Sequence, residues 1–392
     1  MKKLREPARV YFMGARATRK LNLLERFRTF LESIGLEDVV SELDEVGLKL
    51  HFGAPGHTRY LRPDFIREIV EKVKKLRGKP FLCESAGLGY WKTSMHGSGR
   101  TQMLLAYDHG YVPETVGAPI AIVGGMMGTD TLTVPVPNGK FLKEAYLAKD
   151  LVETDTLLVL SHFKGHCRCG FAGALKQLGM GGLTKKGKWM AHYLKMPEVD
   201  PEICDGCEKC VEVCPYGAIT MVEGKAVIDP SKCECCFACV SVCPKQKVNE
   251  EEKQAIVRVR PEDTDFQVRV VDQLAGLLEA RGRRKEYYFN FLIEIPPNCD
   301  CERFSDVPIV QDIGILASED PVAIDQASID LVNAAPGLPD SRLEDIGAVK
   351  PGVDKWRVLW PNSEGGLPML RAAESIGIGT RKYELKKIKF RE

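Results

Sequence analysis

The amino-acid sequence predicts an α/β fold: a layered, largely parallel sheet into which a small, cysteine-rich α+β domain is inserted. Strand-like and helix-like segments alternate on both sides of the chain's middle, which is typical of parallel sheets covered by helices. One stretch, residues 197–249, breaks this alternation and holds nine of the 14 cysteines. At 392 residues, the chain is long enough for two or three domains.

The N-terminal half carries most of the predicted strands. The helix expected at residues 63–76 has an apolar stripe, starts with Pro63 and is followed by Gly78, which are ordinary start and stop signals. The run at 155–160 is apolar throughout, so we expect it at the centre of the sheet. The predicted strands are residues 9–12, 48–52, 81–83, 119–123 and 155–160, and the predicted helices are 21–34, 63–76 and 141–151.

The C-terminal third resumes the alternation. Asp320 and Pro321 suit the N-cap and the first turn of a helix. The predicted helices are residues 266–280, 320–332 and 367–376, and the predicted strands are 287–295, 307–310 and 356–360. We therefore predict one α/β domain formed by residues 1–196 and 250–392, with residues 197–249 as the insert.

The charge balance excludes two classes of binding protein. Lys and Arg total 55 and Asp and Glu total 54, so the net charge is +1. A nucleic-acid binder or a polybasic membrane binder needs a clear positive excess. No apolar run approaches the roughly 20 residues of a membrane helix, and no signal peptide is evident. We expect a cytoplasmic protein with neither nucleic acid nor membrane as a partner.

Clustered cysteines in such a chain indicate metal binding rather than disulfides. The insert contains two runs with the spacing Cys-x2-Cys-x2-Cys-x3-Cys-Pro, which is the spacing of bacterial ferredoxins. In such pairs of runs, the fourth cysteine of each run ligates the cluster of the other run. The predicted ligands of one [4Fe–4S] cluster are Cys204, Cys207, Cys210 and Cys243, and those of the second are Cys233, Cys236, Cys239 and Cys214.

A zinc site would need only four thiolates, so eight cysteines at this spacing favour two clusters. Cys235 lies outside the spacing, and we interpret it as a packing or neighbouring thiol. Iron-bound thiolates require a reducing compartment, which suits a cytoplasmic and anaerobic setting.

Two further Cys-x-Cys pairs follow predicted strands: Cys167 with Cys169, and Cys299 with Cys301. Ligands of open parallel sheets bind beyond the carboxyl ends of the strands. If both strands lie in one sheet, the four thiolates meet at one edge and bind a third metal centre, either zinc or an iron–sulfur cluster. The alternative is that the four residues are free thiols in two unrelated loops.

Candidate catalytic residues surround the first of these pairs. His162 and His166 are the first candidates for proton transfer because histidine titrates near neutrality. Lys164 and Lys176 suit a small anionic substrate. Asp325 lies on a mainly apolar helix, where a carboxylate needs a partner, so it is a further active-site candidate. For each of these residues, a structural role is the alternative.

Several blocks of sequence resemble the iron–sulfur centre proteins of the family named domain of unknown function 362. They are the two cysteine runs and the segments SHFKGH, CGFAGALKQLGMGG, NCDC and DIGILASEDPVAID. The resemblance is collinear from about residue 48 to residue 332, and it implies an α/β domain interrupted by a two-cluster, ferredoxin-like insert.

Three functions remain open from the sequence. The first is an iron–sulfur oxidoreductase that passes electrons through two [4Fe–4S] clusters to a site at the sheet edge. Its electrons would come from a redox partner such as a ferredoxin or a reductase, because neither a nucleotide fingerprint nor a flavin signature is evident. The alternatives are a non-catalytic electron-transfer protein and a protein that handles metals or clusters.

Overall fold

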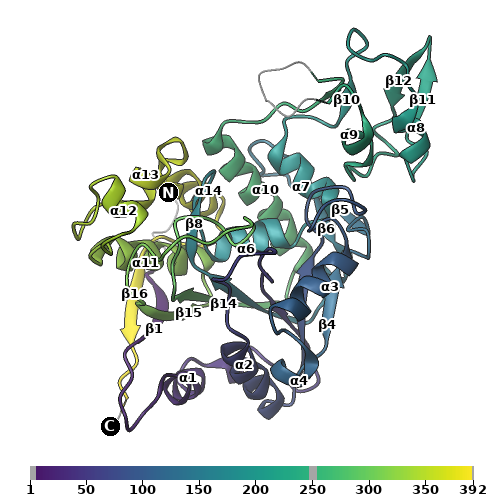
Figure 1. The fold of residues 1–392 in the computed structure, drawn as a ribbon. Helices are drawn as coiled ribbons and strands as arrows, with labels where there is room; N and C mark the ends of the chain where they lie inside the picture. Colours follow the sequence, from purple (N-terminus) through teal and green to yellow (C-terminus); the bar gives the residue numbers. More distant parts are fainter. Residues whose placement is uncertain (1–5, 247–253, 391–392) are drawn as a thin grey trace.

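The computed structural model describes residues 6–246 and 254–390, and an eight-stranded sheet forms its centre (Figure 1). The strand order is β16-β1-β15-β14-β7-β2-β3-β4. β15 runs antiparallel to both of its neighbours, and the other seven strands are parallel to one another. The strands are β1 (Ala8–Gly14), β2 (Glu45–Lys49), β3 (Lys79–Ser85), β4 (Ile120–Val123), β7 (Thr156–His162), β14 (Lys285–Leu292), β15 (Gly314–Ser318) and β16 (Tyr383–Lys387). The predicted layered α/β fold with a largely parallel sheet is confirmed.

Helices cover both faces of the sheet, and the apolar side chains of β7 show why. Leu157 and Val159 belong to the core on one face, whereas Leu158 and Leu160 belong to the core on the other. β7 lies between β14 and β2 near the middle of the sheet, as its continuous apolar run predicted. One face is covered by α1 (Leu23–Glu32), α2 (Pro63–Lys75) and α4 (Pro113–Val116), and the other by α6 (Ala174–Gly181), α10 (Asp263–Arg281), α11 (Pro321–Ala334) and α14 (Leu367–Ile376).

Most predicted elements exist, and the helix start at Asp320 is confirmed, since its carboxylate accepts hydrogen bonds from the amides of Val322 and Ala323. Three predictions are wrong. The segment 141–151 forms β6 (Glu144–Ala148), which pairs with β5 (Thr131–Pro135), followed by α5 (Lys149–Glu153). The segment 356–360 lies in and just after α13 (Lys355–Leu359), whose N-cap Asp354 accepts from the amide of Arg357. Residues 307–310 form no strand beyond a single bridge of Val310, and β15 follows instead.

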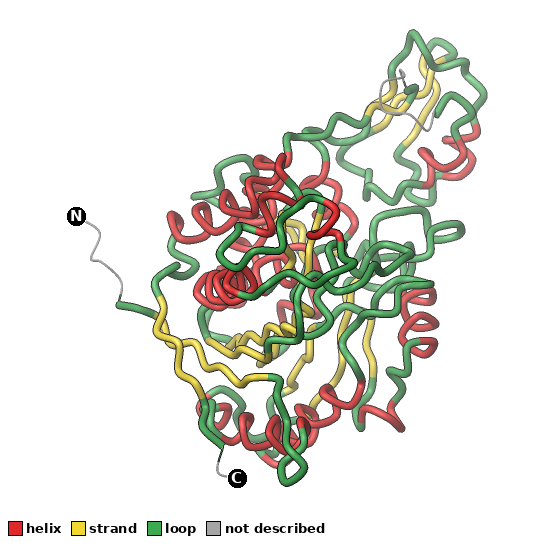
Figure 2. The backbone as a smooth tube through the Cα atoms, turned by 60° about the vertical axis from the view of Figure 1, so that its left-hand side comes forward, coloured by secondary structure: helices red, strands yellow, loops and turns green. Residues whose placement is uncertain are grey.

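The insert extends from one corner of the larger body, as the ribbon and the backbone tube both show (Figures 1 and 2). The antiparallel pair of β10 and β13 lies where the chain leaves the body and returns to it. The elements of this part are β10 (Glu198–Val199), α8 (Lys209–Val213), β11 (Ile219–Val222), β12 (Lys225–Ile228), α9 (Ala238–Val242) and β13 (Ile256–Val257). The predicted end of the insert at residue 249 lies outside the described residues.

The remaining elements are short or border the insert. They are the 3-10 helix η1 (Leu36–Asp38), α3 (Gly99–Asp108), the hairpin of β8 (Lys164–His166) and β9 (Gly170–Ala172), α7 (Lys185–His192), α12 (Arg342–Asp345) and the 3-10 helix η2 (Pro361–Gly366). Within the described ranges, no helix combines the length and the apolar character that crossing a membrane requires.

Candidate functional site

The cysteines of the two runs line two separate hollows in the insert. The first hollow, of about 370 Å³, is bordered by Cys204, Cys207, Cys210 and Cys243. The second, of about 390 Å³, is bordered by Cys214, Cys233, Cys236 and Cys239, together with Cys235. Each hollow therefore collects three cysteines of one run and the fourth of the other, and ligation of a cluster by each set stays a prediction. Four thiols around one space are the donor set of a [4Fe–4S] cluster, so the residues present fit such a group.

The two runs have the same local structure, which explains how the repeat positions its cysteines. The residue after the second cysteine has a positive φ in both runs, 60° at Glu208 and 65° at Phe237. Each of these residues precedes a short helix that carries the third cysteine of its run, and the fourth cysteine is the residue directly after that helix. The chain thus turns sharply after two cysteines and presents the third from the first turn of a helix.

The second hollow lies against the α/β body. Trp189 of α7 lines it, and its ring centroid lies 4.8 Å from that of Phe237. Tyr216 donates a hydrogen bond of 2.9 Å from its hydroxyl to Oγ1 of Thr129 in the body. Tyr90 packs in the same small apolar cluster as Cys236. The second hollow is therefore the one that adjoins the rest of the molecule.

A cavity of about 860 Å³ opens in the body at the carboxyl ends of β2, β3 and β7. This is the edge at which open parallel sheets bind their ligands. The parts of the chain that follow these strands supply much of its wall, and α6 and α7 supply most of the rest. The lining includes Lys49, His51, Glu84, Ser85, His96, Gln102, Lys164, His166, Lys176, Gln177, Lys188, His192, Phe266 and Cys301.

The cavity wall is strongly basic. Among the described residues, four lysines line it against a single carboxylate, Glu84. Glu84 Oε1 lies 2.9 Å from Nζ of Lys49, and its Oε2 lies 2.7 Å from Nδ1 of His51. Although burial opposes its charge, Lys49 and His51 hold the pKa of Glu84 well below its usual range. This one lining anion is therefore already neutralised. Among the described residues, Lys164 pairs with Asp300 beneath the cavity, whereas Lys176 and Lys188 form no ion pair with a carboxylate.

Lys188 shows a second way in which a buried amine is held at this wall. Its Nζ donates to Oγ of Ser85 and to the carbonyls of Ala86 and Leu183 at 2.6–2.8 Å. Burial lowers the pKa of Lys188 to about 7, so both protonation states are accessible near neutral pH. Burial likewise lowers the pKa of His192 to about 3 and that of His96 to about 4, which leaves these rings neutral.

Some polar atoms at the cavity have no hydrogen-bond partner among the described residues. They include Nε2 of His51, Oε1 of Gln102 and Nε2 of Gln177. Gln102 is only 2% exposed and Gln177 only 8%. Buried polar groups are nearly always satisfied in folded proteins, and one left unpaired costs about 1–3 kcal/mol. Water or a polar ligand in the cavity can supply the missing partners.

Beneath the cavity, the buried carboxylate of Asp300 collects basic side chains. Its Oδ2 lies 2.9 Å from Nζ of Lys164, and its Oδ1 lies 3.0 Å from Nδ1 of His162 and 3.5 Å from Nε2 of His57. Nε2 of His162 faces the carbonyl of Ile293 at 2.9 Å, so both ring nitrogens of His162 face acceptors. Although burial opposes its charge, Lys164 and His162 hold the pKa of Asp300 well below its usual range. Asp300 therefore fixes two of the predicted catalytic residues in place.

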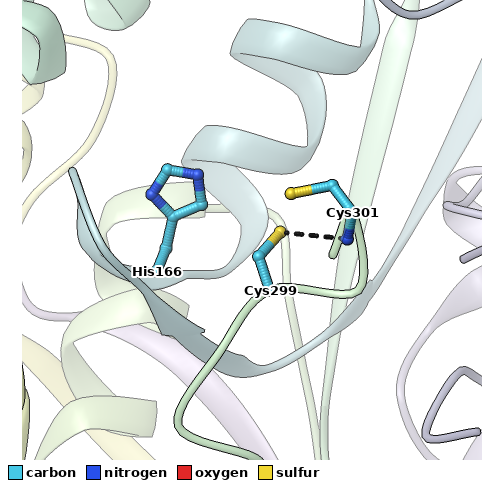
Figure 3. Close-up of side chains that lie close together, drawn as sticks. All are labelled: His166, Cys299 and Cys301. Atoms are coloured by element: carbon cyan, nitrogen blue, oxygen red, sulfur yellow. Dashed lines mark hydrogen bonds between the residues drawn. The ribbon is translucent and has the colours of Figure 1, made fainter. Parts of the chain in front are cut away.

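Close to this carboxylate, His166, Cys299 and Cys301 form one compact group (Figure 3). One ligand atom from each residue lies within 4.8 Å of the others. Nδ1 of His166 accepts the backbone N–H groups of Arg168 and Cys169 at 3.2 and 3.1 Å. In the neutral ring, the proton must then sit on Nε2. Burial lowers the pKa of His166 to about 3, which agrees with a neutral ring.

The structure divides the predicted site residues. Lys164, His166 and Cys301 line the cavity, whereas His162 lies behind it on Asp300. Among the described residues, Cys299 and Cys301 form a close group with His166, and Cys167 and Cys169 are not part of that close group. That all four cysteines share one metal stays a prediction. Cys167 is exposed and Cys169 is buried in the β8–β9 hairpin.

Asp325 lies elsewhere. Its carboxylate accepts the amides of Ala174 and Leu175 at 2.7 and 3.0 Å, at the N-terminal end of α6, and the side-chain amide of Asn290 at 2.8 Å. It does not line the cavity. Burial raises its pKa to about 6. This geometry gives Asp325 a structural role at the start of α6, and its predicted catalytic role has no support in these contacts.

Sequence reasoning missed several residues of the cavity, among them Lys49, His51, Glu84 and Lys188, and it missed Asp300 beneath the cavity. Lys49 and Glu84 lie at the carboxyl ends of β2 and β3, and His51 follows β2 directly. The rule for ligand sites in parallel sheets could have found these three residues. Asp300 stands between two cysteines that were themselves singled out. Lys188 lies on a helix, and we see no local signal that marks it.

Helix α7 connects the cavity with the second hollow. Lys188 and His192 line the cavity, and Trp189 lines the hollow. Leu88 also lines the cavity and packs in the same cluster as Trp189 and Cys235. Because a helix with its side chains is about 10–12 Å wide, the two spaces are separated by roughly that thickness of protein.

A known family matches this chain over residues 46–330, and its description is "Domain of unknown function (DUF362)". The chain belongs to this family. The matched region covers the insert and the adjoining parts of the α/β body on both sides of it. The resemblance that the sequence blocks indicated is therefore confirmed at the level of the family, which names no reaction.

Two curated proteins are similar to parts of the chain. The "Thylakoid-associated protein sll1697" of Synechocystis is 27% identical over 164 residues, which are 40% of this chain and 45% of that protein. An iron–sulfur protein of the CoB--CoM heterodisulfide reductase of Methanopyrus kandleri is 69% identical over 32 residues, which are 8% of this chain and 5% of that protein. The matches thus span less than half the length of each of these relatives.

A solved structure, the lactate racemase apoprotein from Thermoanaerobacterium thermosaccharolyticum, is 13% identical. The superposed region is 59% of this chain and 47% of the racemase chain, and the TM-score is 0.29. So low a score carries no argument about function.

Proposed function

We propose that the chain is an iron–sulfur oxidoreductase that passes electrons from two [4Fe–4S] clusters in the insert to a small anionic substrate in the basic cavity. The proposal rests above all on one observation: α7 borders the second cysteine hollow with Trp189 and the cavity with Lys188 and His192. An electron-carrying domain and a ligand site that share one helix wall are what electron delivery to a bound substrate requires.

The donor set of the insert supports the two clusters. Each hollow is bordered by four cysteines at the spacing that binds [4Fe–4S] groups, and these clusters supply one-electron transfer when bound. Cys207 beside the first hollow is exposed, whereas the second hollow packs against the body. We therefore infer that a redox partner, such as a ferredoxin or a reductase, delivers electrons at the first hollow. Thiolate ligation also implies a reducing compartment.

The cavity wall supports an anionic substrate. Lys176 and Lys188 border the space, and Glu84, its one lining carboxylate among the described residues, is occupied by Lys49 and His51. The unpaired side-chain amide groups of the two buried glutamines in the wall would orient the bound molecule. Lys188, with its pKa lowered to about 7 by burial, can give up a proton to a substrate that is being reduced.

The first part of the test is the iron and sulfide content of protein purified without oxygen. We expect about eight irons per chain. Cys236→Ser removes a cysteine that the spacing assigns to a cluster, so iron should fall to about half, whereas Cys235→Ser is the matched control and should keep the full content. A full content in both variants would refute the assigned ligands.

The second part measures electron delivery. The clusters are reduced with dithionite, excess reductant is removed, and cluster reoxidation is followed by absorbance after small anionic acceptors are added. We expect at least one class of acceptor to speed reoxidation tenfold or more in the wild type, and Lys188→Met to abolish this effect with the clusters intact. If Lys188→Met and the wild type respond equally to every acceptor, the chain is an electron carrier whose cavity takes no part.

A further inference from the structure

We propose that Cys299 and Cys301 are a redox-active dithiol–disulfide couple, which reduces a small anionic organic disulfide bound in the cavity. This inference rests on the proposed function for its supply of electrons, and it names the substrate class and the group that reacts. The geometry of the two sulfurs, the donors that surround them and the hydrogen bonding of His166 carry the argument.

The first observation is the placement of the two sulfurs. Cys299 and Cys301 are two residues apart in the loop after β14, and their sulfurs lie within 4.8 Å of each other (Figure 3). A small rotation about the side chains is enough to bring such sulfurs to bonding distance. Cys301 lines the cavity, while Cys299 is 3% exposed and lies behind it. The outer sulfur can therefore meet a ligand, and the inner one can resolve the product.

The second observation is the set of donors at Cys299. Nζ of Lys176 and the backbone N–H of Cys301 each lie 3.5 Å from its sulfur. A sulfur that receives an ammonium group and an amide is suited to carry the negative charge of the pair. Cys301 then holds the proton. A thiolate beside a thiol is the reduced form of a couple that is ready to react.

The third observation separates this interpretation from a metal site. Nδ1 of His166 accepts two backbone N–H groups, so the ring proton sits on Nε2. Figure 3 shows one ring nitrogen of His166 directed toward the two sulfurs and the other directed away from them. A metal ligand must offer a nitrogen without a proton, but here the nitrogen that faces the sulfurs carries one. His166 is therefore a hydrogen-bond donor to the sulfur pair.

The other Cys-x-Cys pair of the body lacks this environment. Cys167 is exposed at the turn of the β8–β9 hairpin, and Cys169 is buried below it. Burial raises the pKa of both thiols, that of Cys169 to about 12. With the same spacing and a different environment, Cys167 and Cys169 are the natural control for the proposal.

The chemistry balances as two half-reactions. The proton of Cys301 first passes to Cys299, so that Cys301 attacks one sulfur of the substrate disulfide as a thiolate. Cys299 then gives up this proton to the leaving substrate sulfur and attacks the sulfur of Cys301. One substrate S–S bond breaks and one protein S–S bond forms. Both substrate sulfurs leave as thiols, with the thiol proton of the pair and one proton from solvent. The protein disulfide then takes up two electrons, one at a time from the iron–sulfur clusters, and one proton, which restores the thiolate on Cys299 and the thiol on Cys301.

The test measures the couple directly. Cluster-loaded protein is equilibrated without oxygen in glutathione and dithiothreitol buffers of set ratios, free thiols are blocked with N-ethylmaleimide, and the peptides are analysed by mass spectrometry. Oxidised glutathione is itself a small anionic disulfide. We expect the peptide with Cys299 and Cys301 to change from two labels to none in a two-electron transition. Cys167→Ser/Cys169→Ser should leave that transition unchanged.

Lys176 provides a second readout. Its ammonium stabilises the thiolate, and therefore the reduced form, so Lys176→Met should lower the midpoint potential. A tenfold change in the equilibrium corresponds to about 30 mV for a two-electron couple. Lys176→Arg keeps the charge and should remain close to the wild type. Equal shifts in both variants would show that the charge of Lys176 does not act on the couple.

Two results would overturn the proposal. One is that Cys299 and Cys301 keep both labels in every buffer in which the chain stays folded. The other is one equivalent of zinc or another metal that prevents labelling and is lost in Cys299→Ser/Cys301→Ser. Iron content, measured on the same samples, separates this inference from the proposed function. Disulfide formation in protein without clusters would refute the proposed function alone. Intact clusters beside an inert Cys299–Cys301 pair would refute the dithiol–disulfide couple alone.

Discussion

The cysteines of the insert lie between residues 204 and 243, whereas the cavity collects side chains from Lys49 to Cys301. In the insert, one local pattern is used twice, and each copy turns its cysteines toward a hollow. In the body, the site is spread over distant parts of the chain. Parallel strands end at one edge of the sheet, and the residues that follow them meet there.

This difference has an energetic side. The insert buries few large apolar groups. On the proposed function, bound clusters would hold it together, as metals do in small metal-binding domains. The cavity is held by a large α/β core that can support buried charges such as Asp300 and Lys164. Removal of a charged group should therefore lower the free energy of unfolding of the body, and the loss should be larger the more buried the group is. Loss of one surface contact should lower the stability of the insert only slightly.

The largest effect is expected for Asp300→Asn. Asp300 is the buried anion that faces Lys164, His162 and His57, and its loss leaves these basic groups uncompensated. Breaking a buried ion pair in this way costs about 3–5 kcal/mol. Chemical denaturation at pH 7 measures the free energy of unfolding. Glu302→Gln, at an exposed position two residues away, should change it by no more than about 0.5 kcal/mol.

The same variant predicts a dependence on pH. Lys164 and His162, against the opposing effect of burial, hold the pKa of Asp300 well below its usual range. The contribution of Asp300 to stability is therefore present above the pKa of an unfolded aspartate, about 4, and is lost as the pH falls toward the folded value. The wild type should lose more stability than Asp300→Asn on acidification. Parallel curves for the two proteins would show that Asp300 is not held as an anion.

A smaller effect is expected for Asp325→Asn. The new amide group would face the N–H of Leu175, which leaves one donor at the start of α6 unpaired and costs about 1–3 kcal/mol at pH 7. Asp330→Asn on the exposed side of the same helix is the control and should cost less than about 0.5 kcal/mol. A loss of cluster reoxidation without a loss of stability would contradict the structural role of Asp325.

Asp325 also titrates in the opposite sense to Asp300. Burial raises its pKa to about 6, so the folded state prefers the protonated carboxyl. Its contribution is largest below about pH 4 and declines as the pH rises through about 6. Between about pH 4 and pH 7 the wild type should lose about 2–3 kcal/mol relative to Asp325→Asn, which does not titrate. Denaturation curves at several pH values check the sign.

The sequence predicted the parts of this molecule whose geometry is local. The apolar run of β7 and the cap at Asp320 depend on neighbouring residues, and so do the cysteine runs, in which spacing alone selected the two sets that border the hollows. Segment 141–151 was predicted as a helix because its strand β6 is stabilised by pairing with β5. The residues of the segment alone do not reveal this pairing.

The cavity could be predicted only in part because convergence depends on tertiary structure. Strand order brings β7 beside β14 and β2, and this order, not any local pattern, places Cys301 and Lys164 beside Lys49. The Cys-x-Cys pairs were expected to meet if the strands before them lay in one sheet, and β7 and β14 do pair. Among the described residues, Cys299 and Cys301 are close to His166, which the sequence did not place with them.

The smallest effect is expected where the insert meets the body. Tyr216→Phe removes the hydrogen bond from the Tyr216 hydroxyl to Oγ1 of Thr129, which is worth about 0.5–1.5 kcal/mol. Thr129→Val removes the same bond from the other side. If this bond links the insert to the body, the double variant should be as stable as the less stable of the two single variants. The reason is that either single change already removes the whole hydrogen bond. Hydrogen exchange of the insert amides provides a local readout, and should quicken in each variant while the amides of β7 keep their protection. Additive losses in the double variant would mean that the two residues act separately and that the insert is held mainly by the packing of Trp189 against Phe237.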